Sequence, residues 1–318
     1  METGIFRYRQ TAKEAAQVAA HAEALSAEFG EGHELAMPKV WHAPVVFASP
    51  HSGQHYPDGL RKASTLSLAQ LRRNEDAFVD TLFGCAPQLG APLLKATFPR
   101  CFVDVNRPGD DLPPEWLQPG QSRMGPSGSY RARLGLGVVP LIISESLPIH
   151  RQPPTRAEAT ARLDTLYWPY HAKLGKLLQM AKSQFGEALL VDCHSMPGFA
   201  AERAGRKSET KRRPDIILGD GHGRTAHART VDHLEALFSR RGYHVTRNYP
   251  YAGGYATLNY GQPATGVEAV QIEINRDLYL DAATLAPTAG YDELARDVGE
   301  IVADLIAARA PGLSEAAE

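Results

Sequence analysis

The sequence is poor in cysteine, lacks long apolar runs and shows no excess of either charge. Its three cysteines, Cys85, Cys101 and Cys193, have no CxxC spacing, so they indicate neither a disulfide framework nor a thiolate zinc site. We interpret them as small buried residues. No segment approaches the roughly eighteen unbroken apolar residues of a membrane-spanning helix, and the N-terminus lacks the apolar run of a secretory signal. These absences predict a cytoplasmic protein with no membrane partner.

Acidic and basic residues are almost balanced in number. The chain has 34 Lys and Arg against 36 Asp and Glu, for a formal net charge of -2. Such a chain has no overall electrostatic attraction for nucleic acid or for an anionic membrane surface. We therefore expect a small solute as the partner and no nucleic acid, and we leave a homo-oligomer open.

From residue 45 onward, short apolar runs alternate with helical patterns. Strands are expected at residues 45–49, 92–98, 101–105, 188–194, 215–220, 243–247 and 267–274, and helices at 68–86, 155–185, 226–240 and 291–309. This alternation is typical of an α/β sheet covered by helices on both faces. A chain of 318 residues can bury a substantial core, and we treat residues 45–318 as a single α/β domain.

Two stretches differ from this alternation. Residues 1–44 are an expected N-terminal extension, in which the Ala- and Glu-rich segment 11–29 favours a helix. This helix is a candidate for packing on a partner. Residues 107–140 are crowded with Pro and Gly, and a loop of that length inside a compact domain is usually functional.

Reactive side chains lie near or just beyond the carboxyl ends of the expected strands, where open α/β sheets bind ligands. In chain order they are His51, Asn106, Arg107, Asp192, His194, Ser195, Glu273, Asn275 and Arg276. Each has an ordinary structural interpretation by itself, as a core histidine, a paired carboxylate or a solvated charge. Their joint placement favours one cleft that holds them all.

The two histidines of this set suggest a catalytic zinc site. Zinc accepts imidazole and carboxylate ligands and keeps a fourth position open for water, so His51 and His194 need one carboxylate partner. In the segment "HSGQ", Gln54 stands where many zinc hydrolases have the Glu of an HxxE motif. Because a neutral amide is a poor substitute for a carboxylate, the third ligand must come from elsewhere.

The expected helix at 68–86 offers Glu75, Asp76 and Asp80 as the third ligand. Asp76 and Asp80 share one helical face, while Glu75 points about 100° away from Asp76. We favour Asp76 and keep the other two as alternatives, although a carboxylate near a helix start is also favoured by the helix dipole. Asp192, two residues before His194, is the carboxylate expected to hydrogen-bond to the His194 imidazole and orient it.

A series of segments in order gives a more specific signal than any single motif. The segments are "SPHSGQHYP", "DAFVDTLF", "RCFVDVNRP", "YWPYHAKL", "VDCHSMPG", "PDIILGDGHG", "NYPYAGGY" and "VQIEINRDLYLD". Together they resemble the N-formylglutamate amidohydrolases, the deformylases of histidine degradation, from about residue 45 to residue 282.

This resemblance implies a fold and a set of roles. The fold is a mixed, mostly parallel sheet flanked by helices, of the zinc-exopeptidase (phosphorylase/hydrolase-like) type, and the cofactor is one zinc ion per chain. The segment "RCFVDVNR" is similar to an aspartoacylase pattern, which implies Arg100 for polarising the scissile carbonyl and Asn106 with Arg107 for a substrate carboxylate. The segment "QIEINR" implies Glu273 as the general base.

The chemistry of amide hydrolysis requires the same kinds of residue that the resemblance implies. Zinc lowers the pKa of a bound water from about 15.7 toward about 7, and Glu273 would take and return its proton. Arg100 suits the stabilisation of the anionic intermediate. Arg107 and Arg276 are candidates for binding substrate carboxylates, because a guanidinium offers planar paired donors that lysine lacks.

The segment "YAGGY" is a further candidate for substrate contact. Gly253 and Gly254 permit backbone conformations closed to other residues, so this loop could close over substrate with Tyr255 at its tip. An ordinary turn explains the two glycines equally well.

The sequence thus predicts a zinc-dependent amidohydrolase that cleaves N-formyl-L-glutamate to L-glutamate and formate. A related amidohydrolase or carboxypeptidase acting on another N-acyl amino acid is the first alternative, because no sequence stretch measures a pocket that accepts formyl and rejects acetyl. A non-catalytic protein that binds a small ligand in the same cleft is the second alternative, which Gln54 suggests.

Overall fold

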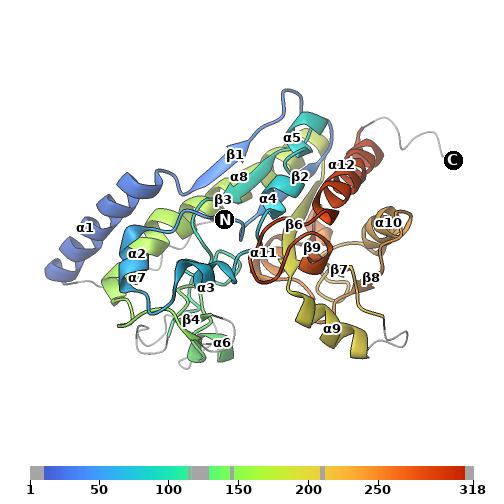
Figure 1. Ribbon diagram of the computed structural model, residues 1–318. Coiled ribbons are helices and arrows are strands. Elements are labelled where there is room, and N and C mark those ends of the chain that lie inside the picture. Colours follow the sequence, from blue (N-terminus) through green and yellow to red (C-terminus); the bar gives the residue numbers. More distant parts are fainter. Residues whose placement is uncertain (1–10, 114–115, 117–128, 144–146, 208–211, 312–318) are drawn as a thin grey trace. The chain divides into compact units, whose positions relative to one another are not determined.

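The computed structural model describes residues 11–113, 116, 129–143, 147–207 and 212–311. The chain divides into two compact units, and most of their elements are labelled in Figure 1. One, the helical unit, consists of Met1–His33, Gly53–Glu75 and Thr97–His171. The other, the sheet unit, consists of Glu34–Ser52, Asp76–Ala96 and Ala172–Glu318. The predicted domain boundary at residue 44 stays a prediction.

The sheet unit contains a seven-stranded sheet with the strand order β1-β3-β2-β6-β9-β7-β8. The strands are β1 (His33–Ala36), β2 (Val45–Ser49), β3 (Leu93–Ala96), β6 (Ala188–Met196), β7 (Ile216–Gly219), β8 (Val245–Arg247) and β9 (Val267–Asn275). β2 pairs in parallel with β3 and β6, β6 with β9, and β7 with β8, whereas β7 and β9 are antiparallel. The prediction of a mixed, mostly parallel sheet flanked by helices is confirmed.

One face of this sheet is apolar and covered by helices. Alternate side chains of the central strands, such as Val191, Leu218 and Ile272, pack in one core. The helices that contribute to this core are α4 (Val79–Leu82), α5 (Ala86–Leu89), α10 (Ala228–Ser239) and α12 (Gly290–Arg309). The buried residues of α12 recur every three or four positions, which is the spacing of a helix with one apolar face.

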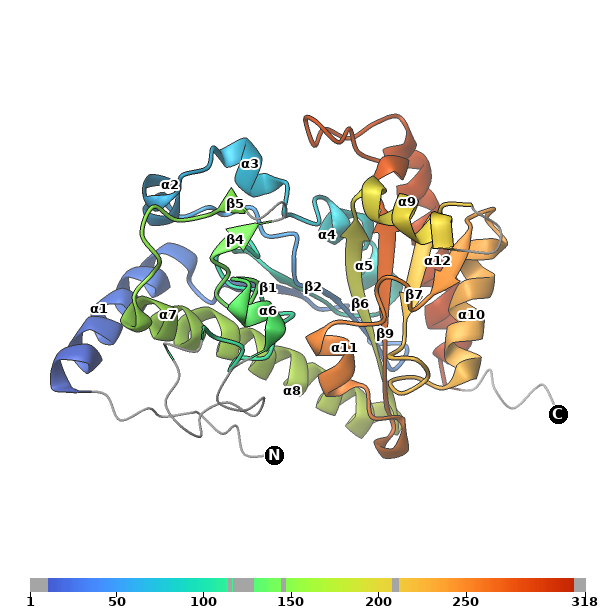
Figure 2. The same ribbon diagram turned by 90° about the horizontal axis from the view of Figure 1, so that it is seen from below.

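The opposite face of the same strands carries polar side chains. Asp192 of β6 is aligned with Gln271 of β9, and His194 with Glu273, and aligned residues of neighbouring strands point to the same side. Helix α11 (Tyr255–Tyr260) packs against β6 and β9 on this side, and Figure 2 shows it across the sheet from α10. All four polar side chains are buried, which is unfavourable unless each has a partner.

The helical unit consists of helices and a short hairpin. Its elements are α1 (Ala12–Phe29), α2 (Asp58–Ala63), α3 (Leu68–Arg72), β4 (Ile142–Ile143), α6 (Tyr130–Arg133), β5 (Leu147–Pro148) and α7 (Arg156–Arg162). Helix α1 begins with a capping box between Thr11 and Glu14, which satisfies free N–H groups of its first turn. It packs against α7, and the Phe29 ring contacts Phe98 and Phe102.

Most of the predicted elements are present. The strands expected at 45–49, 92–98, 188–194, 215–220, 243–247 and 267–274 are β2, β3, β6, β7, β8 and β9, and the helices expected at 11–29, 226–240 and 291–309 are α1, α10 and α12. The helix expected at 155–185 is α7, a π-helical turn (Leu163–Tyr167) and α8 (Trp168–Phe185) in succession. Elements that no sequence pattern predicted include β1, α2, α6, β4, β5, α9 (Gly198–Lys207) and α11.

The single helix predicted at 68–86 is wrong. The segment forms α3, α4 and α5, separated by turns. Phe78 adopts the left-handed conformation with φ 63°, which interrupts a right-handed helix. Asp76 consequently lies in the turn before α4, so the argument that Asp76 and Asp80 share a helical face does not hold.

The strand predicted at 101–105 is also wrong. The segment forms turns, in which the Phe102 N–H donates to Pro99 O over 2.9 Å and the Asp104 N–H donates to Val138 O over 2.8 Å. Its apolar residues are buried, and the Arg162 guanidinium lies over the Phe102 ring at 3.9 Å. The apolar run reflects burial inside the helical unit instead of an extended strand.

The Pro- and Gly-rich stretch at 107–140 is described only in part. Residues 114–115 and 117–128 lie outside the described residues. Within the rest of the stretch, Tyr130–Arg133 form α6.

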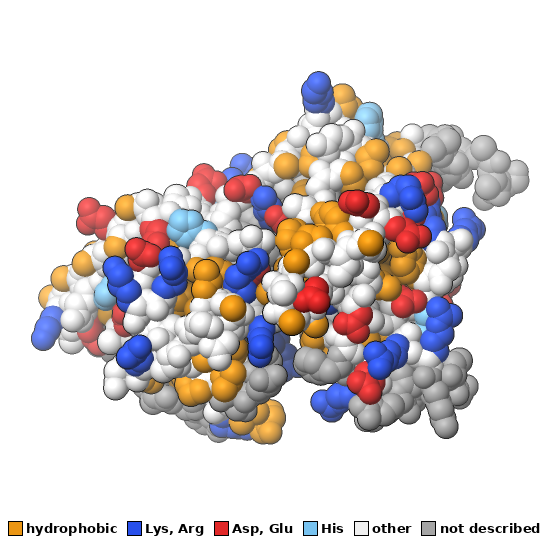
Figure 3. All heavy atoms as spheres, in the orientation of Figure 1, with side chains coloured by type: hydrophobic (Ala, Val, Ile, Leu, Met, Phe, Trp, Pro, Cys, Tyr) orange, Lys and Arg blue, Asp and Glu red, His pale blue; other side chains and the backbone are white. Residues whose placement is uncertain are grey.

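The described surface agrees with the balanced composition. Lys and Arg side chains are interspersed with Asp and Glu over the face drawn in Figure 3, as expected from 34 basic and 36 acidic residues. Among the helices in the described ranges, none has both the length and the apolar character needed to cross a membrane.

Candidate active site

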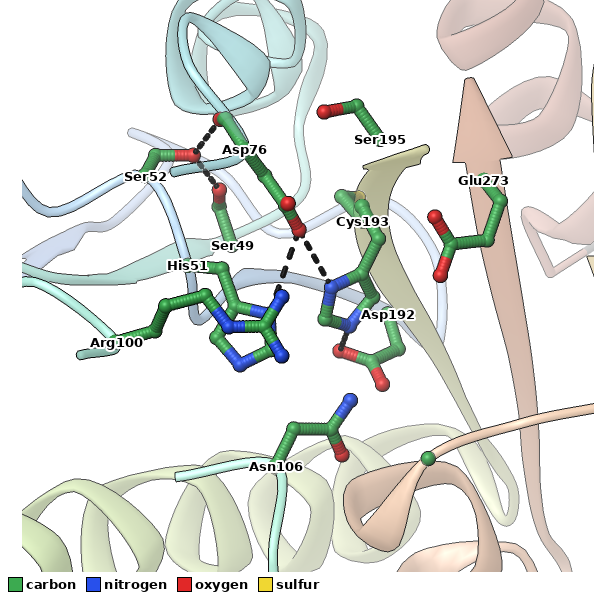
Figure 4. Close-up of polar contacts among 12 residues, drawn as sticks. Ser49, His51, Ser52, Asp76, Arg100, Asn106, Asp192, Cys193, Ser195 and Glu273 are labelled. Atoms are coloured by element: carbon green, nitrogen blue, oxygen red, sulfur yellow. Dashed lines mark hydrogen bonds and ion pairs between the residues drawn. The ribbon is translucent and has the colours of Figure 1, made fainter. Parts of the chain in front are cut away.

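Three ligand-type side chains of the sheet unit converge near the carboxyl ends of β2 and β6. His51 follows β2, Asp76 precedes α4, and His194 lies in β6. Their ligand atoms all lie within 4.8 Å of one another, and all three residues are buried. The Nδ1 atoms of His51 and His194 lie 3.4 Å and 2.9 Å from Asp76 Oδ2 (Figure 4).

Two serines hold the backbone of this site in place. Ser52 Oγ donates to Asp76 O over 3.0 Å and lies 2.6 Å from Ser49 Oγ. The Asp76 N–H donates to His51 O over 3.0 Å. Small hydroxyl residues around His51 therefore join the end of β2 to the turn that carries Asp76.

The second carboxylate oxygen of Asp76 has a separate partner. Arg276 Nη2 donates to Asp76 Oδ1 over 2.8 Å, while Arg276 Nε donates to Ser195 Oγ over 2.9 Å. Burial opposes the charged form of Asp76, but hydrogen bonds with His194 and His51 and the charge of Arg276 hold the pKa of Asp76 well below its usual value. Asp76 thus presents Oδ2 to the two imidazoles as an ionised oxygen.

Asp192 supports the other side of His194. His194 Nε2 lies 3.0 Å from Asp192 Oδ1, and Thr257 Oγ1 of α11 donates to Asp192 Oδ2 over 3.2 Å. Burial disfavours a charged imidazole, but Asp192 and Asp76 together raise the pKa of His194 well above its usual value. A carboxylate on the far nitrogen is the usual partner of a metal-binding histidine, because it fixes the ring and its tautomer.

Glu273 lies on the strand next to His194. The two residues are aligned across the β6–β9 pair, and Glu273 is buried. Gln271 Nε2 donates to Glu273 Oε1 over 2.7 Å, and the Gly254 N–H donates to Gln271 Oε1 over 2.5 Å. A buried carboxylate therefore stands beside the histidine pair in a defined orientation.

The donor set fits a divalent cation. Two imidazoles and one carboxylate face one another, and these are ligand types that zinc accepts in catalytic sites. Two further buried carboxylates, Asp192 and Glu273, lie on the same face of the sheet. A cation bound there would offset this concentration of negative charge.

Comparison with known proteins places the chain in a family. The sequence profile of the N-formylglutamate amidohydrolases matches residues 43–280. The chain belongs to the N-formylglutamate amidohydrolase family. It is 28% identical over 266 residues to an N-formylglutamate deformylase of Pseudomonas aeruginosa and 27% identical over 268 residues to that of Pseudomonas putida, with 83% of this chain and 91% of each relative covered.

A solved structure of an N-formylglutamate amidohydrolase shares the fold. The crystal structure of that protein from Ralstonia eutropha JMP134 superposes with a TM-score of 0.80 and is 34% identical in sequence, covering 88% of this chain and 98% of the other. The resemblance inferred from the sequence segments is confirmed.

Arg100, Asn106 and Arg107, the residues predicted to contact substrate, belong to the helical unit. Arg100 Nη2 donates to Asp104 Oδ2 over 3.0 Å, and the Asn106 N–H donates to Asp104 Oδ1 over 2.9 Å. Arg107 Nε lies 3.9 Å from Asp104 Oδ2. The buried Asp104 carboxylate thus lies close to Arg100, Asn106 and Arg107, which are neighbours in the sequence.

Other groups of the protein surround most of the Arg107 side chain. Its Nε donates to Leu136 O over 3.3 Å, and burial lowers the pKa of Arg107 while Asp104 opposes the shift. Tyr167 Oη donates to Arg107 O over 2.8 Å, and His171 Nε2 lies 2.9 Å from Val105 O. The segment "YWPYHAKL" therefore fixes the backbone that carries Arg107.

The alternatives for the third ligand have other partners. Glu75 accepts from Tyr56 Oη over 2.7 Å and from Arg72 Nε over 3.0 Å. Asp80 Oδ2 lies 3.4 Å from Lys95 Nζ, and Gln54 is exposed. Among the described residues, the carboxylate that lies with His51 and His194 in the possible metal site is that of Asp76.

The "YAGGY" segment is not a free loop. Gly253 has φ 118°, a conformation that favours glycine, and a Cβ on Gly219 of β7 would come within 2.7 Å of the Gly253 nitrogen. Gly254 precedes α11, and Tyr255 is the first residue of that helix instead of the tip of a loop.

Sequence reasoning missed several residues around the site. Gln271, Thr257, Ser52 and Asp104 each support a predicted site residue through a hydrogen bond. Gln271 carried a readable signal, because it lies two positions before Glu273 and strand alternation puts both on one face. Asp104 lies in the segment "RCFVDVNR" but had no predicted role. Thr257 and Ser52 act through contacts that the sequence order does not reveal.

Proposed function

We propose that this protein hydrolyses N-formyl-L-glutamate to L-glutamate and formate. The observation that carries the proposal is the buried group His51, Asp76 and His194, with the Glu273 carboxylate aligned with His194 on the next strand. The family of the chain and the names of its two relatives supply the substrate.

We propose one zinc ion per chain, held by His51 Nδ1, Asp76 Oδ2 and His194 Nδ1. A zinc ion bound there would polarise the formyl carbonyl and lower the pKa of a water molecule. Asp192 holds the His194 ring through Nε2, and Arg276 holds Asp76 through Oδ1.

Glu273 is the proposed general base. Its carboxylate receives the proton of the attacking water and delivers it to the leaving amide nitrogen, which departs as the amine of glutamate. Because Glu273 is buried and held by Gln271, its carboxylate is already oriented for the transfer.

The proposed substrate contacts are those that the segment "RCFVDVNR" predicts. Arg100 stabilises the oxyanion that develops on the formyl oxygen, and Asn106 with Arg107 binds a substrate carboxylate. Arg276, Gly253, Gly254 and Tyr255 remain further candidates for substrate contact. The hydrogen bonds of Arg276 to Asp76 and Ser195 favour a role in holding the metal ligand.

The test combines metal analysis with a substrate series. Purified protein should contain about one zinc per chain, and kcat/KM should be highest for N-formyl-L-glutamate among N-formyl and N-acetyl derivatives of glutamate, aspartate and glutamine. Faster cleavage of an acetyl derivative would favour the alternative amidohydrolase. Ligand binding without any hydrolysis in zinc-loaded protein would favour the binding-protein alternative.

Two matched variants test the third ligand. Asp76→Asn should lose zinc and activity, whereas Asp80→Asn should keep both, because the Asp80 carboxylate lies against Lys95. The reverse result would move the ligand role from Asp76 to Asp80.

A cytoplasmic location and an assembly of identical chains stay predictions.

A further inference from the structure

We infer that Gln271 is a positioning residue that orients the Glu273 carboxylate. This inference rests on the proposed function, in which Glu273 is the general base. Gln271 Nε2 donates to Glu273 Oε1 over 2.7 Å, and both side chains project from the same face of β9. Gln271 is 4% exposed and Glu273 6%, so the contact is shielded from water.

The orientation of the Gln271 amide is determined by its second partner. The Gly254 N–H lies 2.5 Å from Gln271 Oε1, and a backbone N–H can only donate. The amide oxygen must therefore face Gly254, and the NH₂ group must face Glu273. The reversed amide would set two donors against each other and two acceptors against each other.

The backbone that supplies this donor is itself held by the sheet. The Gly221 N–H donates to Ala252 O over 2.6 Å, and Gly219 of β7 approaches Gly253 too closely for a side chain. Helix α11, which follows Gly254, packs on β6 and β9. Gln271 thus connects Glu273 to a fixed point on a neighbouring segment.

A neutral amide is well suited to orient a general base. It holds one carboxylate oxygen without adding a positive charge, whereas an arginine or lysine would stabilise the ionised carboxylate more strongly. The carboxylate keeps its capacity to accept a proton, and its geometry is defined before substrate binds.

A double-mutant cycle tests the inference. Gln271→Met removes both hydrogen bonds at similar length, and it should lower kcat roughly tenfold to a hundredfold, with zinc content, KM and melting temperature close to those of the parent. In the Glu273→Gln background the same change should cost less than about twofold, because the group that Gln271 positions is no longer a base.

Gln271→Glu separates the two hydrogen bonds and covers the case in which the Met variant does not fold. It keeps an acceptor for the Gly254 N–H but has no donor for Glu273 when ionised. Hydrogen exchange at the Gly254 amide should accelerate in Gln271→Met and stay slow in Gln271→Glu, while kcat should fall in both.

Distinct results overturn distinct statements. An equal loss of kcat from Gln271→Met in the parent and in Glu273→Gln would refute the positioning role and leave the proposed function intact. Unchanged exchange at Gly254 in Gln271→Met would refute the connection to that segment. Near-normal turnover in Glu273→Gln would remove Glu273 as the base and the inference about Gln271 with it.

Discussion

At the scale of single residues, the site depends on how Asp76 divides its two carboxylate oxygens. Oδ2 faces the imidazoles of His51 and His194, and Oδ1 accepts from Arg276. A carboxylate held from the side by a guanidinium keeps one oxygen directed at the histidines. Arg276 is 12% exposed in its side chain, so little water competes for this contact.

We expect Arg276→Lys to weaken zinc binding. Lysine keeps the positive charge but cannot donate to Asp76 and Ser195 in the same planar geometry. Loss of such a supporting contact typically lowers metal affinity about tenfold to a hundredfold, and competition with a chromophoric chelator measures it. Arg296→Lys is the matched control, because the Arg296 side chain is 63% exposed. Unchanged zinc affinity in Arg276→Lys would return Arg276 to the substrate-binding candidates.

Arg107 offers a test of substrate recognition. Arg107→Lys keeps the charge and loses the planar pair of donors, so KM for N-formyl-L-glutamate should rise much more than KM for a formylated amine without carboxylates. The measurement is the ratio of kcat/KM, variant over parent, for the two substrates. Equal losses would show that Arg107 does not read the carboxylate.

At the scale of secondary-structure elements, a buried carboxylate joins three elements on the edge of the core. Glu268 of β9 accepts from the His227 N–H, which precedes α10, and from Thr230 Oγ1 within α10, both over 2.7 Å. Arg309 of α12 donates to Glu268 Oε1 over 3.1 Å. Helix α10 has no cap from its own His227 side chain, so Glu268 satisfies its N-terminus from another element.

This arrangement predicts a pH-dependent contribution to stability. Burial opposes ionisation of Glu268, but the hydrogen bonds from Thr230 and His227 and the charge of Arg309 lower its pKa below the usual value. The folded state therefore binds fewer protons, and the stabilisation is present above the usual glutamate pKa of about 4.3 and is lost as the pH falls through the lower folded value.

Glu268→Gln measures this contribution. The variant should lower the free energy of unfolding by about 2 kcal/mol near pH 7, and the difference from the parent should shrink below a pH of about 4. Urea denaturation at several pH values provides the comparison, with Glu23→Gln on the exposed surface of α1 as the control. A difference that stays constant with pH would show that Glu268 acts through packing alone.

At the scale of the whole molecule, the candidate ligands connect distant parts of the sheet unit. His51, Asp76 and His194 come from the end of β2, the turn before α4 and strand β6. A metal bound by the folded state and not by the unfolded chain stabilises the protein, by about 2.7 kcal/mol when its free concentration is 100 times the dissociation constant.

Removal of zinc should consequently lower the melting temperature. A chelator added to the purified protein should shift the thermal transition downward by several degrees, and added zinc should restore it. His194→Ala should lack both bound zinc and activity, and its transition should not respond to the chelator. A chelator shift of equal size in His194→Ala would mean that metal stabilises the chain at another place.

The amino-acid sequence determined the sheet and the identity of the reactive residues. Mostly apolar runs of strand length predicted β2, β6 and β9, because strands that are buried on both faces are rich in apolar residues, and the polar residues near their ends were readable as His51, His194 and Glu273. The exclusion of Gln54 left Glu75, Asp76 and Asp80 as candidates, and the helical-face argument that favoured Asp76 is wrong because Phe78 breaks the helix.

The tertiary structure decided which partner each of these residues has. Arg276 meets Asp76 from 200 positions away, and Thr257 meets Asp192 from 65, and no local pattern encodes contacts at that separation. The turn at 101–105 was predicted as a strand because burial makes a segment apolar whatever its backbone conformation. Local sequence thus specified element type and side-chain chemistry, whereas hydrogen bonds between distant segments settled orientation, because they form only after the chain has packed.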